Sequence, residues 1–226
     1  MHTIETFELR NVDPDDVSDV LRKVEKSFGF TFNNEELKDI KTFGELCDIV
    51  AGKVEGEHKN DCTSQQAFYK LRHCIAMAAG SRINAITPDT NLQQLFPKHL
   101  RRKNIKAIEQ KLGFKLNLLQ PKHRIPEALV LLLLASIAYI FIDWRIGFTG
   151  IFLYIVTNVI ANRSANEIPS QNLKQLVQKI TRENYRKSRR NPATINRSEI
   201  VEQVKALFVN DLILESSVLH RKATFD

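Results

Sequence analysis

The chain has 226 residues, of which 43% are apolar and 26% charged, so disordered, collagenous and coiled-coil chains are excluded. Eight glycines and seven prolines are few for an all-β protein, and three cysteines without a CxxC motif argue against a disulfide framework or a zinc ribbon. The first twenty residues carry acids and no apolar core, so we expect no secretory signal.

The formal net charge of +7 is distributed in blocks along the chain. Residues 1–97 carry a net −5, and the first 62 of them alone carry −7. Residues 98–124 carry +8 and residues 163–197 carry +7, whereas residues 125–162 carry only −1. Two basic blocks therefore flank one that is almost uncharged.

Residues 1–57 predict two helices. In the first, apolar residues recur at spacings of three and four, as in an amphipathic helix, and Gly29 ends it. These apolar residues are Val17, Val20, Leu21, Val24 and Phe28. The second helix starts after Thr42, with Glu45 three residues later as a capping box, and runs to about Val54.

Residues 63–120 predict a second helical module, with one helix ending near Ala79 and another running from about Lys98 to Leu112. Its end, IEQKLGFKL at residues 108–116, matches VEKSFGFTF at residues 24–32 with only conservative differences. We favour a true repeat. The alternative is that any amphipathic helix with a glycine C-cap has this pattern.

Residues 126–162 predict a transmembrane hairpin with spans at about 126–143 and 146–162. Runs of fifteen and sixteen uncharged residues are separated only by residues 143–145. A spanning helix needs about 20 residues, with roughly 17 as the lower limit. Trp144 at the turn suits a membrane–water interface as an anchor. The alternative is a buried helical hairpin in a soluble core, because such helices are also apolar all round.

The basic flanks predict the orientation and the first partner. The positive-inside rule places residues 1–124 and 163–226 together in the cytoplasm, with the hairpin in the cell inner membrane. We interpret residues 163–197 as a basic juxtamembrane segment that contacts a lipid bilayer with anionic headgroups. Nucleic acid is the rival for this charge, but aromatics suited to base stacking are missing apart from Tyr185, so we expect no nucleic-acid partner.

The candidate headgroup contacts lie on both sides of the hairpin. Before it come Lys98, Arg101, Arg102, Lys103 and Lys106. After it come Lys174, Lys179, Arg182, Arg186, Lys187, Arg189 and Arg190.

Residues 198–226 predict one helix and an apolar loop. Ile200, Val204, Leu207 and Phe208 have a spacing complementary to that of the first helix of the chain. We therefore expect the two ends of the chain to pack together, either within one chain or by exchange between two chains in a homodimer.

The N-terminal region resembles the second half of a bacterial acyl carrier protein. In that family the second helix ends in Glu-x-x-Phe-Gly-Ile, an acidic turn follows, and Thr-Val-Gly-x-Leu opens the last helix. The matching residues here are Glu25, Phe28, Gly29 and Phe30, an acidic turn at residues 33–37, and Thr42, Phe43, Gly44 and Leu46. Residues 198–226 resemble the first half, and residues 63–120 resemble the family more faintly. The whole chain also resembles membrane-anchored bacterial proteins of uncharacterised function that carry such segments.

The resemblance implies a helical carrier-like bundle, but the residues depart from it where the cofactor attaches. A working carrier has Asp-Ser-Leu at the start of its second helix, and the serine holds phosphopantetheine. Here that position is Pro14, which has no hydroxyl, so we expect no cofactor. The alternative is a true carrier modified at Ser18, one turn later. Carriers also present an acidic second helix to partner proteins, which suggests a partner surface at Asp13, Asp15, Asp16 and Asp19.

No catalytic constellation is evident in the sequence. None of the six histidines forms an i, i+4 pair or an HExxH motif, and no GxSxG, Walker A or GxGxxG motif occurs. We therefore expect no metal and no enzymatic activity, with an unrecognised active site as the alternative. The predicted function is a membrane-tethered, acyl-carrier-like adaptor with a cytoplasmic protein partner.

Overall fold

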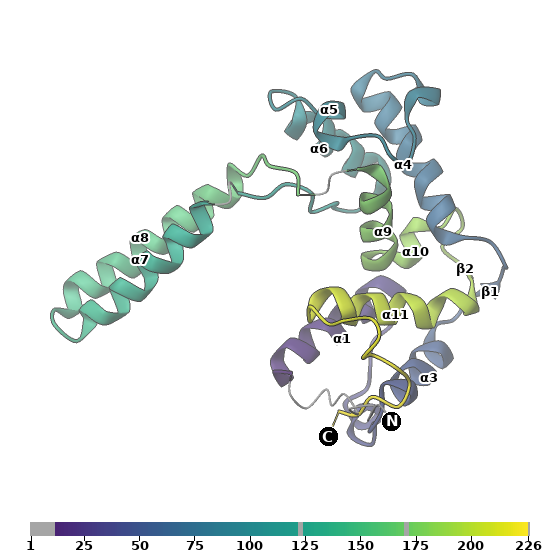
Figure 1. Ribbon diagram of the computed structural model, residues 1–226, viewed down its shortest axis with the longest axis horizontal. Helices are drawn as coiled ribbons and strands as arrows, with labels where there is room; N and C mark the ends of the chain where they lie inside the picture. Colours follow the sequence, from purple (N-terminus) through teal and green to yellow (C-terminus); the bar gives the residue numbers. More distant parts are fainter. Residues whose placement is uncertain (1–11, 122–123, 170–171, 226) are drawn as a thin grey trace, which may run out of the picture. The chain divides into compact units, whose positions relative to one another are not determined.

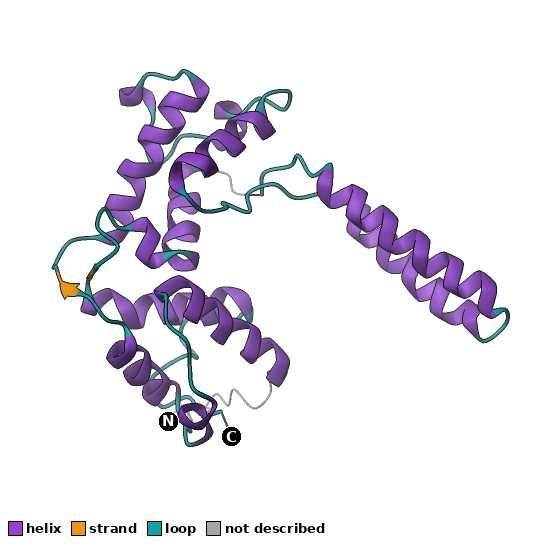
Figure 2. Ribbon diagram, turned by 180° about the vertical axis from the view of Figure 1, so that it is seen from behind, coloured by secondary structure: helices purple, strands orange, loops and turns teal. Residues whose placement is uncertain are grey.

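The computed structural model describes residues 12–121, 124–169 and 172–225. Within these ranges the chain forms eleven α-helices, one short 3-10 helix and two strands of two residues each (Figures 1 and 2). The predicted all-α class is therefore confirmed. The chain divides into a terminal unit, Met1–Cys74 with Lys174–Asp226, and a central unit, Ile75–Leu173.

Both ends of the chain contribute helices to the terminal unit. Its elements are α1 (Pro14–Phe28), α2 (Asn34–Lys38), α3 (Phe43–Lys53), β1 (Glu57–His58), most of α4 (Thr63–Ala79) and of α9 (Leu173–Glu183), α10 (Tyr185–Ser188), β2 (Thr194–Ile195) and α11 (Arg197–Asp211). The two strands are parallel, with Glu57 opposite Thr194 and His58 opposite Ile195.

The helix starts and stops in the N-terminal region follow the predicted signals. Asp13 is the N-cap of α1, and Gly29 ends that helix in the left-handed conformation with φ 72°. Thr42 and Glu45 form the capping box of α3. The predicted acidic turn at residues 33–37 is instead the short helix α2, because Asn33 and Glu36 form a second capping box.

The hydrophobic core of the terminal unit joins the two ends of the chain. α11 contacts both α1 and α3, and the three helices lie side by side in Figure 1. The core residues that these helices bury are Val20, Val24, Phe28, Phe43, Leu46, Cys47, Val50, Ile200, Val204, Leu207 and Phe208. The chain after α11 closes the bundle, since Thr224 pairs with Thr42 in an antiparallel bridge. The predicted packing of the two ends is therefore confirmed.

The central unit contains the hairpin and a smaller set of helices. Its elements are the 3-10 helix η2 (Ile83–Ala85), α5 (Leu92–Leu95), α6 (Arg101–Leu112), α7 (Arg124–Ile140) and α8 (Trp144–Arg163). α7 and α8 pack against each other as an antiparallel pair joined by the turn at residues 141–143 (Figure 1).

The repeated segments adopt the same local structure. Gly29 and Gly113 both end their helices in the left-handed conformation, and their N–H groups donate to Glu25 O and Glu109 O, respectively. Each of these glutamates also accepts, through its carboxylate, the backbone N–H seven residues later, at 2.7 Å in both cases. The agreement therefore extends from the sequence to the hydrogen bonds of the helix end.

The segment predicted as a basic juxtamembrane stretch folds further than expected. Residues 173–188 form α9 and α10, and their apolar side is buried at Leu173, Leu176, Val177, Ile180 and Tyr185. The spacing of three and four among the first four of these residues, Leu173 to Ile180, was present in the sequence. The high density of Lys and Arg in the same stretch led instead to the prediction of a basic juxtamembrane segment.

Candidate functional site

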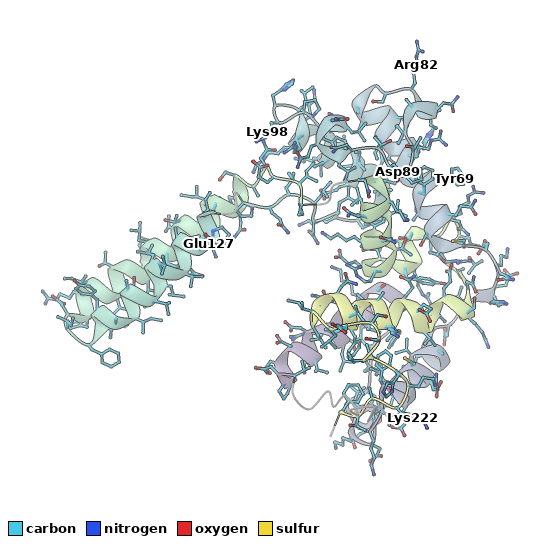
Figure 3. The ribbon with its side chains drawn as sticks, in the orientation of Figure 1. Tyr69, Arg82, Asp89, Lys98, Glu127 and Lys222 are labelled. Carbon is cyan, nitrogen blue, oxygen red and sulfur yellow. The ribbon has the colours of Figure 1, made fainter. Side chains whose placement is uncertain are left out.

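The hairpin turns its large apolar side chains outward, and in Figure 3 side chains project from all sides of the helix pair. The exposed residues are Val130, Leu131, Leu134, Ile137, Tyr139, Phe141, Ile142, Trp144, Ile146, Phe148, Phe152, Leu153, Ile155, Val156, Val159 and Ile160. A hairpin in a soluble core would have these side chains covered. Among the described residues, α8 alone is long and apolar enough to cross a membrane, and α7 is a shorter apolar helix.

Small residues form the contact between the two hairpin helices. A Cβ placed on Gly147 would lie 2.8 Å from the backbone nitrogen of Ile140, and one placed on Gly150 would lie 2.9 Å from Ser136 Cβ. Ser136 is itself buried, and its hydroxyl donates to Leu132 O at 2.6 Å. Close approach through glycine and serine is typical of helix pairs in membranes. Lipid tails are as apolar as the helix surfaces, so no hydrophobic effect drives the helices together and close packing of small residues does so instead.

The predicted acidic surface lies on the first turns of α1. Asp13, Asp15, Asp16 and Asp19 are all exposed. Asp13 accepts the N–H of Asp15 at 2.9 Å, and Asp19 pairs with Arg22. These carboxylates lie at the positive end of the helix dipole, which stabilises them there without a ligand.

The residues relevant to phosphopantetheine attachment lie on the same helix. Pro14 is the first residue of α1, a position that suits proline because the N–H there has no partner in the helix. Ser18 is exposed one turn later. The same helix also lines an apolar pocket of about 190 Å³, which the sequence did not predict. The pocket is lined by Val17, Leu21, Leu37, Ile40, Leu46 and Phe225.

Two of the arginines predicted to contact lipid headgroups are buried. Arg101 is 2% exposed and donates to Phe96 O and Asn166 O. Arg189 is fully buried. For these two residues the structure contradicts the prediction, because their guanidinium groups are held by protein acceptors.

The remaining predicted basic residues have different environments. Lys103, Lys106, Lys187 and Arg190 are exposed. Lys98, labelled in Figure 3, pairs with Glu167 at 3.1 Å.

Two further arginines bind backbone carbonyls. Arg102 donates to the carbonyls of Arg163 and Ala165, and Arg186 donates to Glu55 O. Contact of the exposed residues with headgroups stays a prediction.

Arg189 is the centre of a buried polar network that sequence patterns did not reveal. Its guanidinium donates to Thr63 Oγ1 at 2.6 Å and to Thr194 Oγ1 at 3.1 Å, and it pairs with Asp61. Thr63 in turn donates its N–H to Glu199 at 3.0 Å. The network links the start of α4 to the start of α11 and is satisfied by protein groups, so it is structural in character.

The described residues offer little for nucleophilic or metal chemistry. Burial raises the pKa of the Cys47 thiol to about 12, which keeps it protonated and unreactive at neutral pH. No group of three or more His, Cys, Asp or Glu side chains comes together as a metal site within the described ranges.

Comparisons of the chain with protein-family models, with curated proteins and with solved structures gave no match. The acyl-carrier resemblance therefore rests on the motifs of the sequence.

Proposed function

We propose that the protein is a membrane-tethered, acyl-carrier-like adaptor that presents an acidic helical surface to a cytoplasmic protein and carries no phosphopantetheine. The hairpin of α7 and α8 crosses the cell inner membrane, and both termini lie in the cytoplasm. The terminal unit, built from both ends of the chain, is the recognition module.

The observation that carries the proposal is the outward direction of the apolar side chains on the hairpin. α8 has 20 residues, which at 1.5 Å per residue give about 30 Å, the thickness of the hydrocarbon core. α7 has 17 residues, about 25 Å, which is at the lower limit for a span. Trp144 is exposed at the turn, where its amphipathic ring suits the interface.

The acidic surface of α1 supports the adaptor role. Four exposed carboxylates lie within two turns, and such a surface attracts basic partners. Pro14 stands at the position where the resemblance expects the modified serine. Proline has no hydroxyl, so the cofactor has no attachment point there. The same bundle formed by exchange of α11 between two chains would give a homodimer with this core, and that stays a prediction.

Two alternatives make different use of α1. A true carrier would hold phosphopantetheine on Ser18, whose exposed side chain lies on the same helix. An enzyme would need an active site that the sequence motifs do not reveal.

The test of the cofactor question is intact-mass spectrometry after coexpression with a phosphopantetheinyl transferase. We expect the unmodified mass. A gain of one phosphopantetheine, lost in Ser18→Ala, would replace the adaptor with the carrier.

The partner surface is tested by photo-cross-linking from Ser18 in intact cells. Substituting Asp15, Asp16 and Asp19 together by Asn should abolish the cross-linked product. The control substitutes Glu35, Glu55 and Glu57 by Gln, which removes the same charge from other exposed positions of the terminal unit. Equal loss of the cross-linked product in both triple variants would show that the partner responds only to the overall charge of the protein. That result would contradict a defined binding surface on α1.

A further inference from the structure

A groove of about 410 Å³ lies in the central unit at the end of α8 that is remote from the hairpin turn. Its residues come from α6, from the segment that follows α6, and from the end of α8. They are Arg102, Ile105, Lys106, Glu109, Lys115, Asn117, Leu118, Leu119, Asn162, Arg163 and Ala165. Its volume is within the range of ordinary ligand sites.

The charge of the groove is strongly positive. Four of its residues are cationic and one, Glu109, is anionic, so the net charge is +3. Glu109 already accepts the N–H of Leu116 at 2.7 Å. No carboxylate of the described residues lies within ion-pair distance of Lys106, Lys115 or Arg163. Three cations therefore face one groove without a protein counter-ion in the described part of the chain, which favours an anionic ligand.

The walls of the groove are held in place by the backbone. Gln120 and Glu167 form an antiparallel bridge, with N···O distances of 2.9 and 3.1 Å. Arg102 donates to Ala165 O at 3.0 Å through Nε, which fixes α6 against the chain that leaves α8. The arrangement of cations is therefore set by the fold of the central unit, so that a ligand does not have to order it.

The position of the groove identifies the ligand class. Asn162 and Arg163 follow directly after the exposed apolar residues Val159 and Ile160 of α8. Three residues of helix span about 4.5 Å, so Arg163 lies at the depth of the headgroups if Ile160 lies in the hydrocarbon. Of the apolar residues next to its cations, Leu119 is half-buried, whereas Ile105 and Leu118 are buried beneath the groove. A phospholipid in the bilayer holds its phosphate at this depth, whereas free phosphate has no preference for it, so the position of the groove favours the lipid.

We infer that this groove is a binding site for the phosphate of one anionic phospholipid in the cytoplasmic leaflet. The inference rests on the proposed membrane tether, but it goes beyond general attraction of basic residues to headgroups. It assigns a discrete site to Lys106, Lys115 and Arg163, of which Lys115 lies outside both the predicted headgroup contacts and the predicted basic segment. Exposed Lys103 and Lys111 of α6 lie outside the groove and take no part.

The test is native mass spectrometry of the full-length protein from mixed phosphatidylglycerol and phosphatidylcholine bilayers. Wild-type protein should retain one phosphatidylglycerol in preference to phosphatidylcholine. Lys106→Gln with Lys115→Gln should weaken retention roughly 30-fold, since each cation near an anionic headgroup contributes about a factor of five. The matched control, Lys103→Gln with Lys111→Gln, removes the same charge from exposed positions of α6 outside the groove and should leave retention unchanged.

Several outcomes would overturn the inference. Equal loss in both double variants would show diffuse electrostatics, and no loss in either would show that the groove is not a lipid site. Displacement of the lipid by inorganic phosphate, with the phosphate bound at one per chain, would assign the groove to free phosphate. Displacement by an RNA oligonucleotide would assign it to nucleic acid. Failure of the proposed function is separate, because wild-type protein would then leave the membrane in an alkaline carbonate wash before any lipid is counted.

Discussion

The terminal unit and the hairpin are both rich in apolar residues. The terminal unit buries these side chains in its core, whereas the hairpin exposes them on its outer surface. Val24, Phe28, Leu207 and Phe208 of the terminal unit are fully buried, whereas Phe141, Ile142 and Phe152 of the hairpin are 67% or more exposed. In the terminal unit a polar face accompanies the apolar face of each helix, as water requires. The hairpin helices lack such a polar face and expose their large apolar side chains, a pattern that agrees with the membrane location proposed for them.

The contacts between helices differ in the same way. α1, α3 and α11 pack through large side chains such as Phe43 and Phe208, whose ring centroids are 5.3 Å apart. α7 and α8 pack through Gly147, Gly150 and Ser136. Burial of large apolar side chains stabilises packing in water. Close backbone approach through small residues is typical of helix pairs in lipid, so the hairpin contact agrees with the proposed membrane location.

The largest effect should follow from deleting residues 198–226, which removes α11. The core then loses Ile200, Val204, Leu207 and Phe208, and we expect the amides of residues 17–28 to lose hydrogen-exchange protection. The hairpin helices should keep their own protection, because they belong to the central unit. Ile213→Ala, at a side chain 91% exposed, is the control. Unchanged protection of residues 17–28 in the truncated protein would show that the two ends are independent.

Arg189→Met should destabilise the terminal unit by about 3 kcal/mol, because it leaves Asp61 and Glu199 without their buried cation. Arg190→Met is the matched control: the neighbouring side chain is exposed, so the expected change is small. Urea unfolding followed by far-ultraviolet circular dichroism measures both variants. Equal free energies of unfolding for the two would contradict the structural role of the network.

Gly150→Leu should separate the hairpin helices, since even a Cβ at this position meets Ser136 Cβ at 2.9 Å. Overpacking of this kind costs about 1–3 kcal/mol. Hydrogen exchange of α7 and α8 in lipid nanodiscs should rise, while exchange of the terminal unit stays as in the wild type. Thr149→Leu is the control, because Thr149 is the exposed neighbour of Gly150 and its replacement should leave the exchange of α7 and α8 unchanged. A larger effect of Thr149→Leu would mean that the assigned interface is wrong.

The smallest effect concerns acid stability of α3. The backbone N–H groups of Lys41 and Thr42 hold the pKa of Glu45 below its ordinary value of 4.5. A lowered folded pKa contributes stability that is present above pH 4.5 and is lost as the pH falls through the folded value. Glu45→Gln retains an acceptor but does not titrate, so the acid dependence of α3 exchange should flatten. Exposed Glu55→Gln should leave it unchanged, and the same slope in both variants would argue against the cap.

The helices of the terminal unit were largely predictable because their signals are local. Asp13, Thr42 with Glu45, and Gly29 mark starts and stops through hydrogen bonds within a few residues. The apolar spacing of α1 and α11 also revealed which faces would meet. The exposure of Asp13, Asp15, Asp16 and Asp19 agrees with the partner surface that the acyl-carrier resemblance suggests.

The buried arginines and the groove were not predictable from such signals. Arg101 and Arg189 are indistinguishable in sequence from their exposed neighbours Arg102 and Arg190, because each has acceptors that come from distant segments. Arg189 binds Thr63, 126 positions away, and Arg101 binds Asn166, 65 positions away. The groove likewise joins residues near position 106 to residues near position 163, which only the folded chain brings together.

The placement of the hairpin in a bilayer can be measured on the unmodified protein, since Trp144 is its single tryptophan. Its ring is 61% exposed at the hairpin turn. In vesicles containing brominated phospholipids, we expect tryptophan fluorescence to be quenched most by bromine high on the acyl chain, near the interface, and to be shielded from aqueous iodide. Efficient quenching by iodide, with no effect of brominated lipid at any depth, would contradict a membrane-spanning hairpin.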